Sequence, residues 1–486
     1  MSFFLAAAAF CASGYALLWL LRLATGRLAV DLAASWFVGT GFYSLAVFVL
    51  RFLFGVPYTA LSALAVLALP PAALAGAWAS GRRSPGAAPP GSVAPPSPAR
   101  LVPRPVWLFA PLAAYVLFTA AVTVLHGVNT PTQTDDALRV RALAPVLAFR
   151  DEWNAEARGV LVMSGPIPTF VPSLGWRLTG SVDQFHVNGS ILLGLVALLL
   201  LSVALPSARG SPERGWASAF AVLSLPLFVY HCTATYADAT LAIYLGAAFL
   251  FFIEFGLGAD EADGKRAMLL LVGAAMVKRE GEITAGAVAA VLLAQAAWQG
   301  RRSGEALLRR LLLLCLPLVP VLVARVFLVG WRSAFPFLSV AAQRAVEAAP
   351  QVQSAPALAV QARVVPAFVW SVFSSGSGGI VYWVLAAVLA LQLGAVRRRG
   401  AAWTLAAVLL LFAEVAVTSL WLFPAFTVDQ STVNRQMLPL AVATALWLAA
   451  LLAPGAPLPV AGAISARAGP AEPGEKRRRE GKRRRP

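Results

Sequence analysis

Apolar runs of about twenty residues recur along most of the chain, and this feature restricts the fold more than any other. An α-helix needs about 20 apolar residues to cross the hydrocarbon of a bilayer. The chain is 59% hydrophobic and only 13% charged, whereas a soluble domain carries about 25% charged residues. The sequence therefore predicts an all-α, polytopic transmembrane protein whose solvent is lipid.

Thirteen segments have, or come close to, the length and apolarity of a membrane span. The eighth is too short to cross alone, and it needs the flanking Lys265–Arg266 and Lys278–Arg279 pairs to reach both interfaces. The predicted spans are residues 2–21, 34–54, 57–79, 106–126, 187–205, 216–232, 239–257, 267–277, 282–298, 311–330, 379–396, 401–423 and 436–453.

The basic residues predict the orientation of these spans. With the tail KRRREGKRRR (Lys476 to Arg485) in the cytoplasm, 26 of the 39 Lys and Arg residues fall on the inner side. Cytoplasmic loops carry such an excess, so we expect the N-terminus outside and the C-terminus in the cytoplasm. The net charge of +17 comes from these loop clusters, so the predicted partner is the lipid bilayer and not nucleic acid. The Ala- and Arg-rich usage is typical of a GC-rich bacterium, and hence predicts an inner (plasma) membrane.

The sequence divides into five segments. A three-helix membrane extension (1–80) precedes a Pro-rich cytoplasmic linker (81–105). A membrane core (106–300) has a long outer loop at 127–186, and the C-terminal helices (301–455) have another at 331–378, whose apolar part predicts an interfacial helix. A disordered basic cytoplasmic tail (456–486) ends the chain.

The polar residues that are suited to catalysis or binding gather on the predicted outer face. The first outer loop contains TPTQTDDALRVRALAPVLAFRDE, in which Asp135 and Asp136 precede a segment with apolar residues at helical spacing. This pattern predicts an amphipathic helix lying on the membrane surface. One Asp is explained as an N-cap, but a second beside it repels the first and needs a partner, so a functional role is an equal alternative.

The next outer turn, VYHCTATYADATLAIY, brings together His231, Tyr236 and Asp238. Asp238 is expected to face outward just before a long apolar span. The alternative interpretation is a capping acid beside aromatic residues of the interfacial belt.

The third outer turn, MVKREGE, holds Lys278, Arg279 and Glu280 at membrane depth. Burying ionisable residues at this depth costs free energy, and such residues are usually functional. Alternatively, their long side chains reach the interface from the end of a short span. The last outer turn supplies Arg435, whose planar guanidinium suits a phosphate. Within the spans, Glu414 and Arg325 are expected to pair, either structurally or in a mechanism.

In this order and on one side of the membrane, these motifs resemble the GT-C superfamily of membrane glycosyltransferases. Within it, the pattern is similar to bacterial relatives of protein O-mannosyltransferases and of the lipid A aminoarabinose transferase, and the resemblance covers roughly residues 106–300. It implies that Asp135 is the catalytic base. Asp136 stands where Glu is more usual, and Ala137 stands where a Tyr often follows the acidic pair.

The resemblance also assigns the remaining residues. Its acid of the second outer turn matches Asp238, and its Lys-x-Glu-Gly pattern matches the KREG that begins at Lys278. The implied site has catalytic Asp135 and Asp136; substrate-binding His231, Tyr236, Asp238 and Glu280; and lipid-phosphate-binding Lys278, Arg279 and Arg435.

The resemblance implies transfer of a sugar from a polyprenyl-phosphate donor to a lipid, polysaccharide or protein acceptor. An inverting reaction needs a carboxylate to take the proton of the attacking hydroxyl, and cations to neutralise the departing phosphate. The aspartates also suit Mg²⁺ or Mn²⁺, but the many basic residues favour a metal-independent site. Two alternatives remain open: a transporter or flippase of a lipid-linked or polar solute, and an enzyme of the O-antigen ligase or polymerase type.

Overall fold

The computed structural model describes residues 2–80, 110–130, 143–153, 165–234, 236–258, 260–303, 312, 314–316, 319, 355–373, 379–398, 401–422 and 431–452. All regular elements within these ranges are helices. They are α1 (Ser2–Leu20), α2 (Leu28–Leu53), α3 (Ala60–Ala79), α4 (Ala110–Asn129), α6 (Ala144–Arg150), α8 (Pro166–Thr179), α9 (Gln184–Ala208), α10 (Pro212–Leu223), α11 (Pro226–Thr233), α12 (Ala237–Gly258), α13 (Glu261–Ala275), α14 (Arg279–Ser303), α19 (Ala355–Phe373), α20 (Gly379–Arg398), α21 (Ala402–Val417), the π-helical η3 (Thr418–Leu422) and α23 (Ser431–Leu452).

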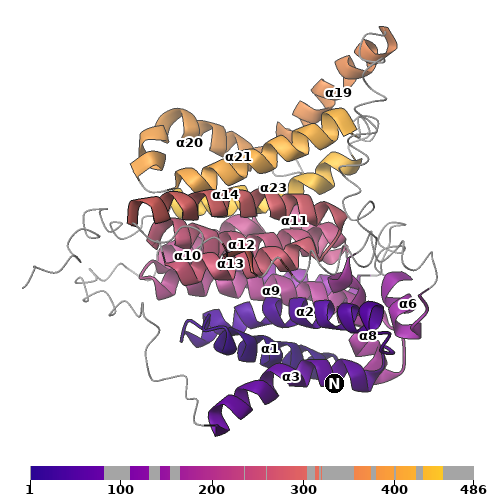
Figure 1. Cartoon of the computed structure of the whole chain (residues 1–486). Coiled ribbons are helices and arrows are strands. Elements are labelled where there is room, and N and C mark those ends of the chain that lie inside the picture. Colours follow the sequence, from indigo (N-terminus) through magenta and orange to yellow (C-terminus); the bar gives the residue numbers. More distant parts are fainter. Residues whose placement is uncertain are drawn as a thin grey trace, which may run out of the picture.

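The long helices run roughly parallel to one another, while α19 projects away from the rest (Figure 1). Nine of the described helices are long and apolar enough to cross a membrane, and the count is ten if α10 and α11 form one bent span. The protein is therefore a helical, multi-pass membrane protein, as predicted. The total of thirteen spans stays a prediction, because most of the segment 311–330 lies outside the described residues.

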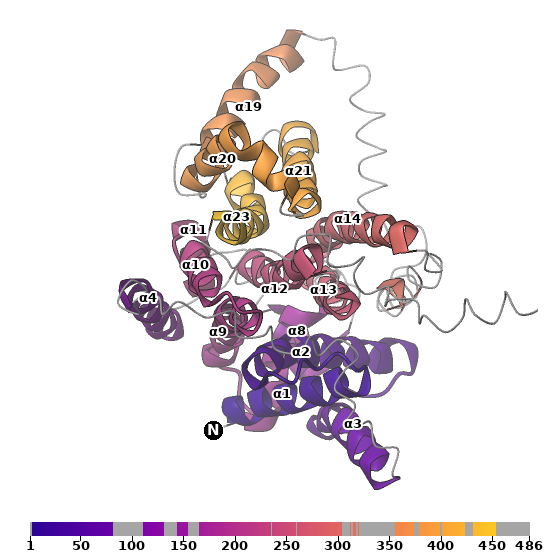
Figure 2. The same cartoon turned by 90° about the vertical axis from the view of Figure 1, so that its left-hand side faces the viewer.

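The central helix is α12, which is buried along most of its length. It packs against α9, α13 and α23, and it also contacts α11, α14 and α21; Figure 2 shows these helices gathered around it. Because a surrounded helix has no lipid-facing or water-facing side, it is apolar all round. The sequence ATLAIYLGAAFLFFI within α12 has this character.

Two predicted spans differ in the structure. The segment 216–232 forms two helices, α10 and α11, bent by 70°. Pro226 begins the second helix, and a proline inside a continuous helix would remove a backbone hydrogen bond and clash with the preceding turn. The short segment 267–277 forms α13, which extends toward the N-terminus through Lys265 and Arg266 but ends at Ala275, before Lys278.

The predicted outer loop 127–186 contains a buried helix that the sequence did not predict. The helix is α8, whose residues from Ile167 to Trp176 are all buried. It packs against α2, α6 and α9. A chain of hydroxyls anchors it, because Tyr58 lies 2.8 Å from the hydroxyl of Tyr43 and 3.0 Å from that of Ser173. The short helix α6 falls within the predicted amphipathic segment.

The predicted interfacial helix of the second outer loop overlaps α19, which is longer than the sequence suggested because it begins at Ala355. Pro366 lies inside this helix. The linker 81–105 and the basic tail 456–486 lie outside the described residues, so the division of the chain into five segments stays a prediction.

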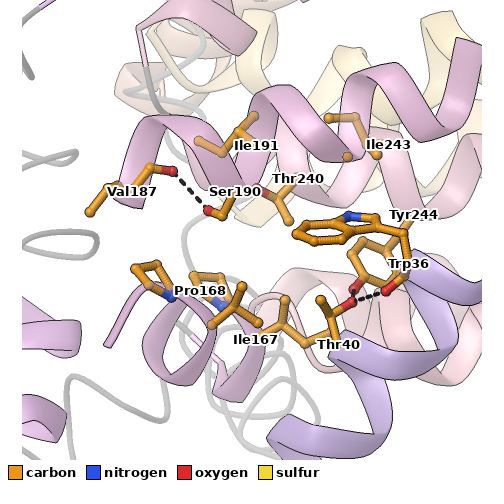
Figure 3. Close-up of a pocket in the computed structure, with 13 residues that line it drawn as sticks. Trp36, Thr40, Ile167, Pro168, Val187, Ser190, Ile191, Thr240, Ile243 and Tyr244 are labelled. Atoms are coloured by element: carbon orange, nitrogen blue, oxygen red, sulfur yellow. Dashed lines mark hydrogen bonds between the residues drawn. The ribbon is translucent and has the colours of Figure 1, made fainter. Parts of the chain in front are cut away.

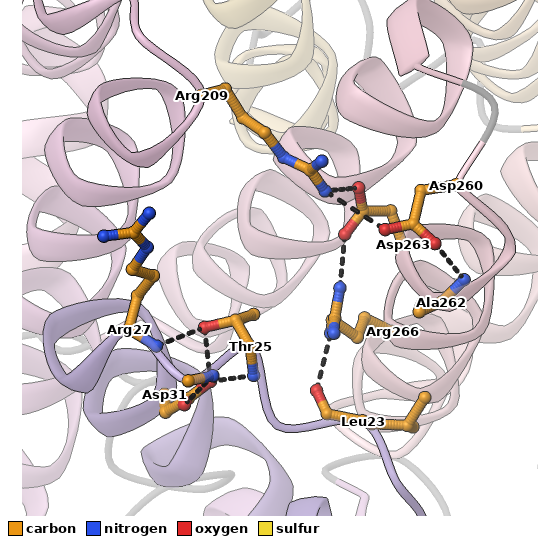
Figure 4. Close-up of polar contacts among 10 residues, drawn as sticks. Leu23, Thr25, Arg27, Asp31, Arg209, Asp260, Ala262, Asp263 and Arg266 are labelled. Atoms are coloured by element: carbon orange, nitrogen blue, oxygen red, sulfur yellow. Dashed lines mark hydrogen bonds and ion pairs between the residues drawn. The ribbon is translucent and has the colours of Figure 1, made fainter. Parts of the chain in front are cut away.

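A network of charges ties one end of the bundle together (Figure 4). Arg266 donates to Asp263 at 2.5 Å and to the Leu23 carbonyl at 2.7 Å. Arg209 binds the carboxylates of Asp260 and Asp263. Buried ion pairs of this kind need several partners to offset their desolvation, so the network fixes the connection between α1 and α2 against the start of α13. A separate buried pair joins Arg214 to Glu254.

The first two helices touch through their backbones. A Cβ atom at Gly39 of α2 would lie 1.9 Å from the carbonyl oxygen of Phe10, and one at Gly14 of α1 would lie 2.0 Å from that of Ser35. Small residues allow such close approach of membrane helices, where packing replaces the hydrophobic effect as the force for association.

We predict that Gly39→Ala destabilises the protein by about 1–3 kcal/mol, because the added methyl group has no space between the helices. The matched control is Gly41→Ala in the same helix, where a Cβ would meet nothing within 4 Å. Thermal unfolding of the purified protein in detergent measures both variants. Equal midpoints for the two variants would show that α1 and α2 are not in backbone contact.

Candidate functional site

A buried carboxylate lies at the centre of the candidate site. Asp238 is in the first turn of α12, and only 1% of its side chain is exposed. Its Oδ1 accepts from the Lys278 ammonium, and its Oδ2 accepts from Nε of Arg435 at 3.0 Å. Asp238 thus faces the interior of the bundle, and its place on the outer side of the membrane stays a prediction. Two cations from other helices stabilise its charge inside the bundle, where an unpaired carboxylate would be costly.

Lys278 reaches Asp238 from the turn between α13 and α14. The turn closes through hydrogen bonds from Val277 N to the Ala274 carbonyl and from Gly281 N to the Lys278 carbonyl. A Cβ at Gly281 would lie 2.5 Å from the Ala274 carbonyl oxygen, so the glycine of the KREG motif is what allows this tight turn. Lys278 is 11% exposed.

The Lys278 ammonium stays charged despite its surroundings. Burial disfavours the charged form, but the carboxylate of Asp238 outweighs this effect and raises the pKa of Lys278 above its ordinary value. The lysine is thus a permanent cation at neutral pH, as a phosphate-binding role requires.

Aromatic rings extend the site on the side of Arg435. The guanidinium carbon lies 5.2 Å from the centroid of the Tyr236 ring, a cation–π distance. The Tyr236 ring in turn stacks on that of His231, with centroids 4.5 Å apart. About a third of the Arg435 side chain is exposed, so this cation faces the open side of the cluster.

The site therefore joins residues that are far apart in the sequence. His231, Tyr236 and Asp238 come from α11 and the start of α12, Lys278 from the next turn, and Arg435 from α23. Glu280 lies beside Lys278, with 3.6 Å between its Oε2 and the Nζ of the lysine, and the Glu280 side chain is about half exposed. The side chain of Arg279 lies outside the described residues.

Two features of the site were not predicted from the sequence. One is the N-terminus of α8, where the amide of Ile167 donates to the Met276 carbonyl at 3.2 Å. Gly165 is needed there, because it has φ +69° and a Cβ would lie 2.4 Å from the same carbonyl oxygen. The signal was the GPIP sequence, since proline is favoured at the first position of a helix.

The second feature is the surroundings of Glu414, which lies in α21. Its carboxylate accepts a hydrogen bond from the Thr284 hydroxyl at 3.0 Å. The carboxylate also interacts electrostatically with Lys278 and Glu280. Immediately beyond it, α21 widens into the π-helical η3, and such widening is frequent at functional sites. The predicted pairing of Glu414 with Arg325 is untested, because Arg325 lies outside the described residues.

The predicted catalytic pair, Asp135 and Asp136, also lies outside the described residues. Among the residues that are described, no three His, Cys, Asp or Glu side chains come together as a metal site. Two of the three acids that would suit a divalent cation, Asp135 and Asp136, lie outside the described residues, so the expected metal-independent site stays a prediction.

No protein-family model matches this chain, and neither the curated proteins nor the solved structures contain a significant match. The GT-C resemblance rests on the sequence motifs alone.

We predict that Asp238→Asn destabilises the protein by about 3–5 kcal/mol, because Lys278 and Arg435 would then repel each other without a buried counter-charge. Glu261→Gln is the control, since Glu261 makes a half-exposed pair with Lys265, which contributes about 0–1 kcal/mol. Chemical denaturation in detergent compares the two. Similar losses would contradict a central role for Asp238.

Proposed function

We propose that the protein is an inverting glycosyltransferase that moves a sugar from a polyprenyl-phosphate donor to an acceptor at the outer face of the membrane. The observation that carries this proposal is the convergence of Lys278 and Arg435 on Asp238. Two cations at the ends of membrane helices suit the phosphate of a lipid whose hydrocarbon tail remains in the bilayer.

In the proposed reaction, the acceptor hydroxyl attacks the anomeric carbon on the face opposite the phosphate. A new carbon–oxygen bond forms as the bond from the anomeric carbon to the phosphate oxygen breaks, and the phosphate leaves with the electron pair. Lys278 and Arg435 neutralise this departing charge, with Arg279 as a third cation from the same turn. The hydroxyl proton passes to Asp135, the proposed general base.

The remaining residues have proposed binding roles. Tyr236 and His231 form an aromatic surface beside Arg435, and a sugar ring packs well on such a surface through its C–H groups. Glu280 accepts hydrogen bonds from sugar hydroxyls, Asp238 orients Lys278 and Arg435 toward the donor, and Asp136 supports the charge of the transition state. In this proposal the site faces the periplasm of a bacterial inner membrane, with the C-terminus in the cytoplasm.

We predict that Asp135→Asn lowers the rate of transfer by about 10²–10⁴-fold, the usual contribution of a general base. The assay follows release of polyprenyl phosphate from radiolabelled polyprenyl-phosphate sugars presented to the purified protein. Membrane insertion and the thermal midpoint serve as controls, and both should match the unmodified protein. Full transfer by this variant would remove Asp135 from the mechanism.

We predict that Lys278→Ala weakens donor binding by about 10–100-fold, because a hydrogen bond to a charged group contributes about 1.5–3 kcal/mol. The matched control is Lys265→Ala, which removes a lysine from the opposite end of α13. The apparent donor affinity in the same assay is the measured quantity. An unchanged affinity would argue against phosphate binding by Lys278.

Glu414 supports one alternative, a transporter of a lipid-linked or polar solute. It is a half-buried carboxylate within a candidate membrane span, and ionisable residues inside the membrane often carry protons in transporters. The transfer assay separates the two functions, because a transporter moves its solute across a vesicle membrane without cleaving the sugar–phosphate bond.

A further inference from the structure

The two sides of α12 differ in what they offer a substrate. Thr240 is about 200° from Asp238 around the helix axis, because successive residues of an α-helix are about 100° apart. Thr240 lines a small pocket between α2, α8, α9 and α12, in which the hydroxyls of Thr40 and Tyr244 are bonded to each other (Figure 3). The volume of this pocket is about 30 Å³, which is room for about two water molecules. It is too small for a sugar or a lipid chain, so a bound donor meets the other side, where α12 packs against α14, α21 and α23.

Glu414 of α21 lies on that other side, next to the site at Asp238. Its carboxyl interacts electrostatically with Lys278. Its helix continues into η3, where the Ser419 hydroxyl lies 3.4 Å from the side-chain oxygen of Gln436, the residue after Arg435. The segment that carries Glu414 thus borders both the turn of Lys278 and the helix of Arg435.

The contacts of the Thr284 hydroxyl favour a proton on Glu414. This hydroxyl lies 3.0 Å from Oε1 of Glu414 and 3.0 Å from the backbone carbonyl of Glu280. A hydroxyl has a single proton to donate, and a threonine in a helix can donate it to the carbonyl four residues earlier. A protonated Glu414 then supplies the proton of the other contact, in which the Thr284 oxygen accepts.

The remaining surroundings of Glu414 favour the same state. Among the described residues, no Lys or Arg forms an ion pair with Glu414, and its Oε2 makes no hydrogen bond. An unpaired charge inside a membrane span costs free energy, whereas a protonated carboxyl is neutral. Because the torsion about the last bond of a Glu side chain is broad, a turn of the carboxyl moves the proton from Thr284 to the open side.

The departing phosphate creates a need for such a proton. Two cations meet one carboxylate at Asp238, so this contact has a single excess positive charge, and Arg279 and Glu280 of the turn add one charge of each sign. The excess balances a polyprenyl-phosphate sugar, which is a phosphodiester with one negative charge. The phosphate monoester that leaves gains a second negative charge, and the described part of the site has no further cation for it.

We propose that Glu414 holds a proton in the resting protein and gives it to the departing phosphate, as the general acid of the transfer. This role rests on the proposed function. The O–H bond of Glu414 breaks as an O–H bond forms on the phosphate oxygen, which keeps the electron pair of its former bond to the sugar. Asp135 takes the proton of the acceptor hydroxyl in the same reaction, and water returns a proton from Asp135 to Glu414 after the products leave.

Infrared spectroscopy of the full chain in detergent tests the resting state, because a protonated carboxyl absorbs apart from an ionised carboxylate. The expected spectrum at neutral pH has a protonated-carboxyl band, part of which is missing in Glu414→Gln. Glu261→Gln is the matched control and should retain the whole band, since Glu261 forms a half-exposed ion pair with Lys265. Equal bands in all three proteins would overturn the proposal.

The transfer assay tests the catalytic step. Glu414→Gln should lower the rate of transfer by about 100-fold, which is the lower end of the usual contribution of a general acid. The thermal midpoint should stay unchanged, because the glutamine amide donates to the Thr284 oxygen as the protonated carboxyl does. A purely structural role predicts an unchanged rate, and that result would sink the proposal.

The pH dependence of transfer reports the direction in which the proton moves. A general acid acts only while it holds its proton, so the rate of the unmodified protein should fall as the pH rises through the titration of Glu414. This alkaline loss should disappear in Glu414→Gln, which keeps the other charged groups of the site, namely Lys278, Glu280, Asp238 and Arg435. If the variant instead lacks a fall in rate at low pH, Glu414 accepts a proton and the proposal is wrong.

The same experiments separate this role from the proposed function. If the unmodified protein transfers sugar and Glu414→Gln transfers it equally fast, only the role of Glu414 fails. If neither protein cleaves a polyprenyl-phosphate sugar, the proposed function fails, and the proton transfer to phosphate fails with it even where the infrared band is present.

Discussion

The buried carboxylate of Asp238 is the interaction on which the described part of the molecule depends. Its two cationic partners come from a turn 40 residues later and from a helix 197 residues later. Charges inside a membrane bundle persist only if they find partners. This one contact therefore fixes the relative positions of α12, of the turn between α13 and α14, and of α23.

The opposite end of α13 has a charge network of its own, in which Arg209 and Arg266 bind Asp263. Between the two ends, α12 and its neighbours are almost wholly apolar. The two polar ends thus bracket an apolar layer, as expected of a protein that spans a bilayer. In the proposed function, the end that holds Asp238 binds a lipid headgroup, and the other end has a mainly structural role.

Much of this arrangement follows from the sequence. The spans follow from length and apolarity, and placing the basic clusters on one side predicts that His231, Asp238, Lys278 and Arg435 share the opposite end of the bundle. Sidedness alone does not give contacts, however. The sequence placed Asp238, Lys278 and Arg435 in one implied site, but it did not indicate that both cations bind the carboxylate of Asp238.

The differences between the predicted and the observed helices have local physical causes. Three prolines in α8, at positions 166, 168 and 172, are typical of a loop. Two of them, however, lie in the first turn of the helix, where the backbone amide has no helical hydrogen bond to make. Pro226 follows an apolar run without interrupting it, so the hydropathy of 216–232 conceals a bend. The expected meeting of Asp135 with the cluster stays a prediction, because Asp135 lies outside the described residues.

The contact between α2 and α12 has a consequence for the order in which the bundle assembles. The Thr40 hydroxyl of α2 meets the Tyr244 hydroxyl of α12, which lies 204 positions later in the chain. Synthesis runs from the N-terminus, so α2 is complete long before its partner on α12 exists. This contact can therefore form only after most of the described helices have been made.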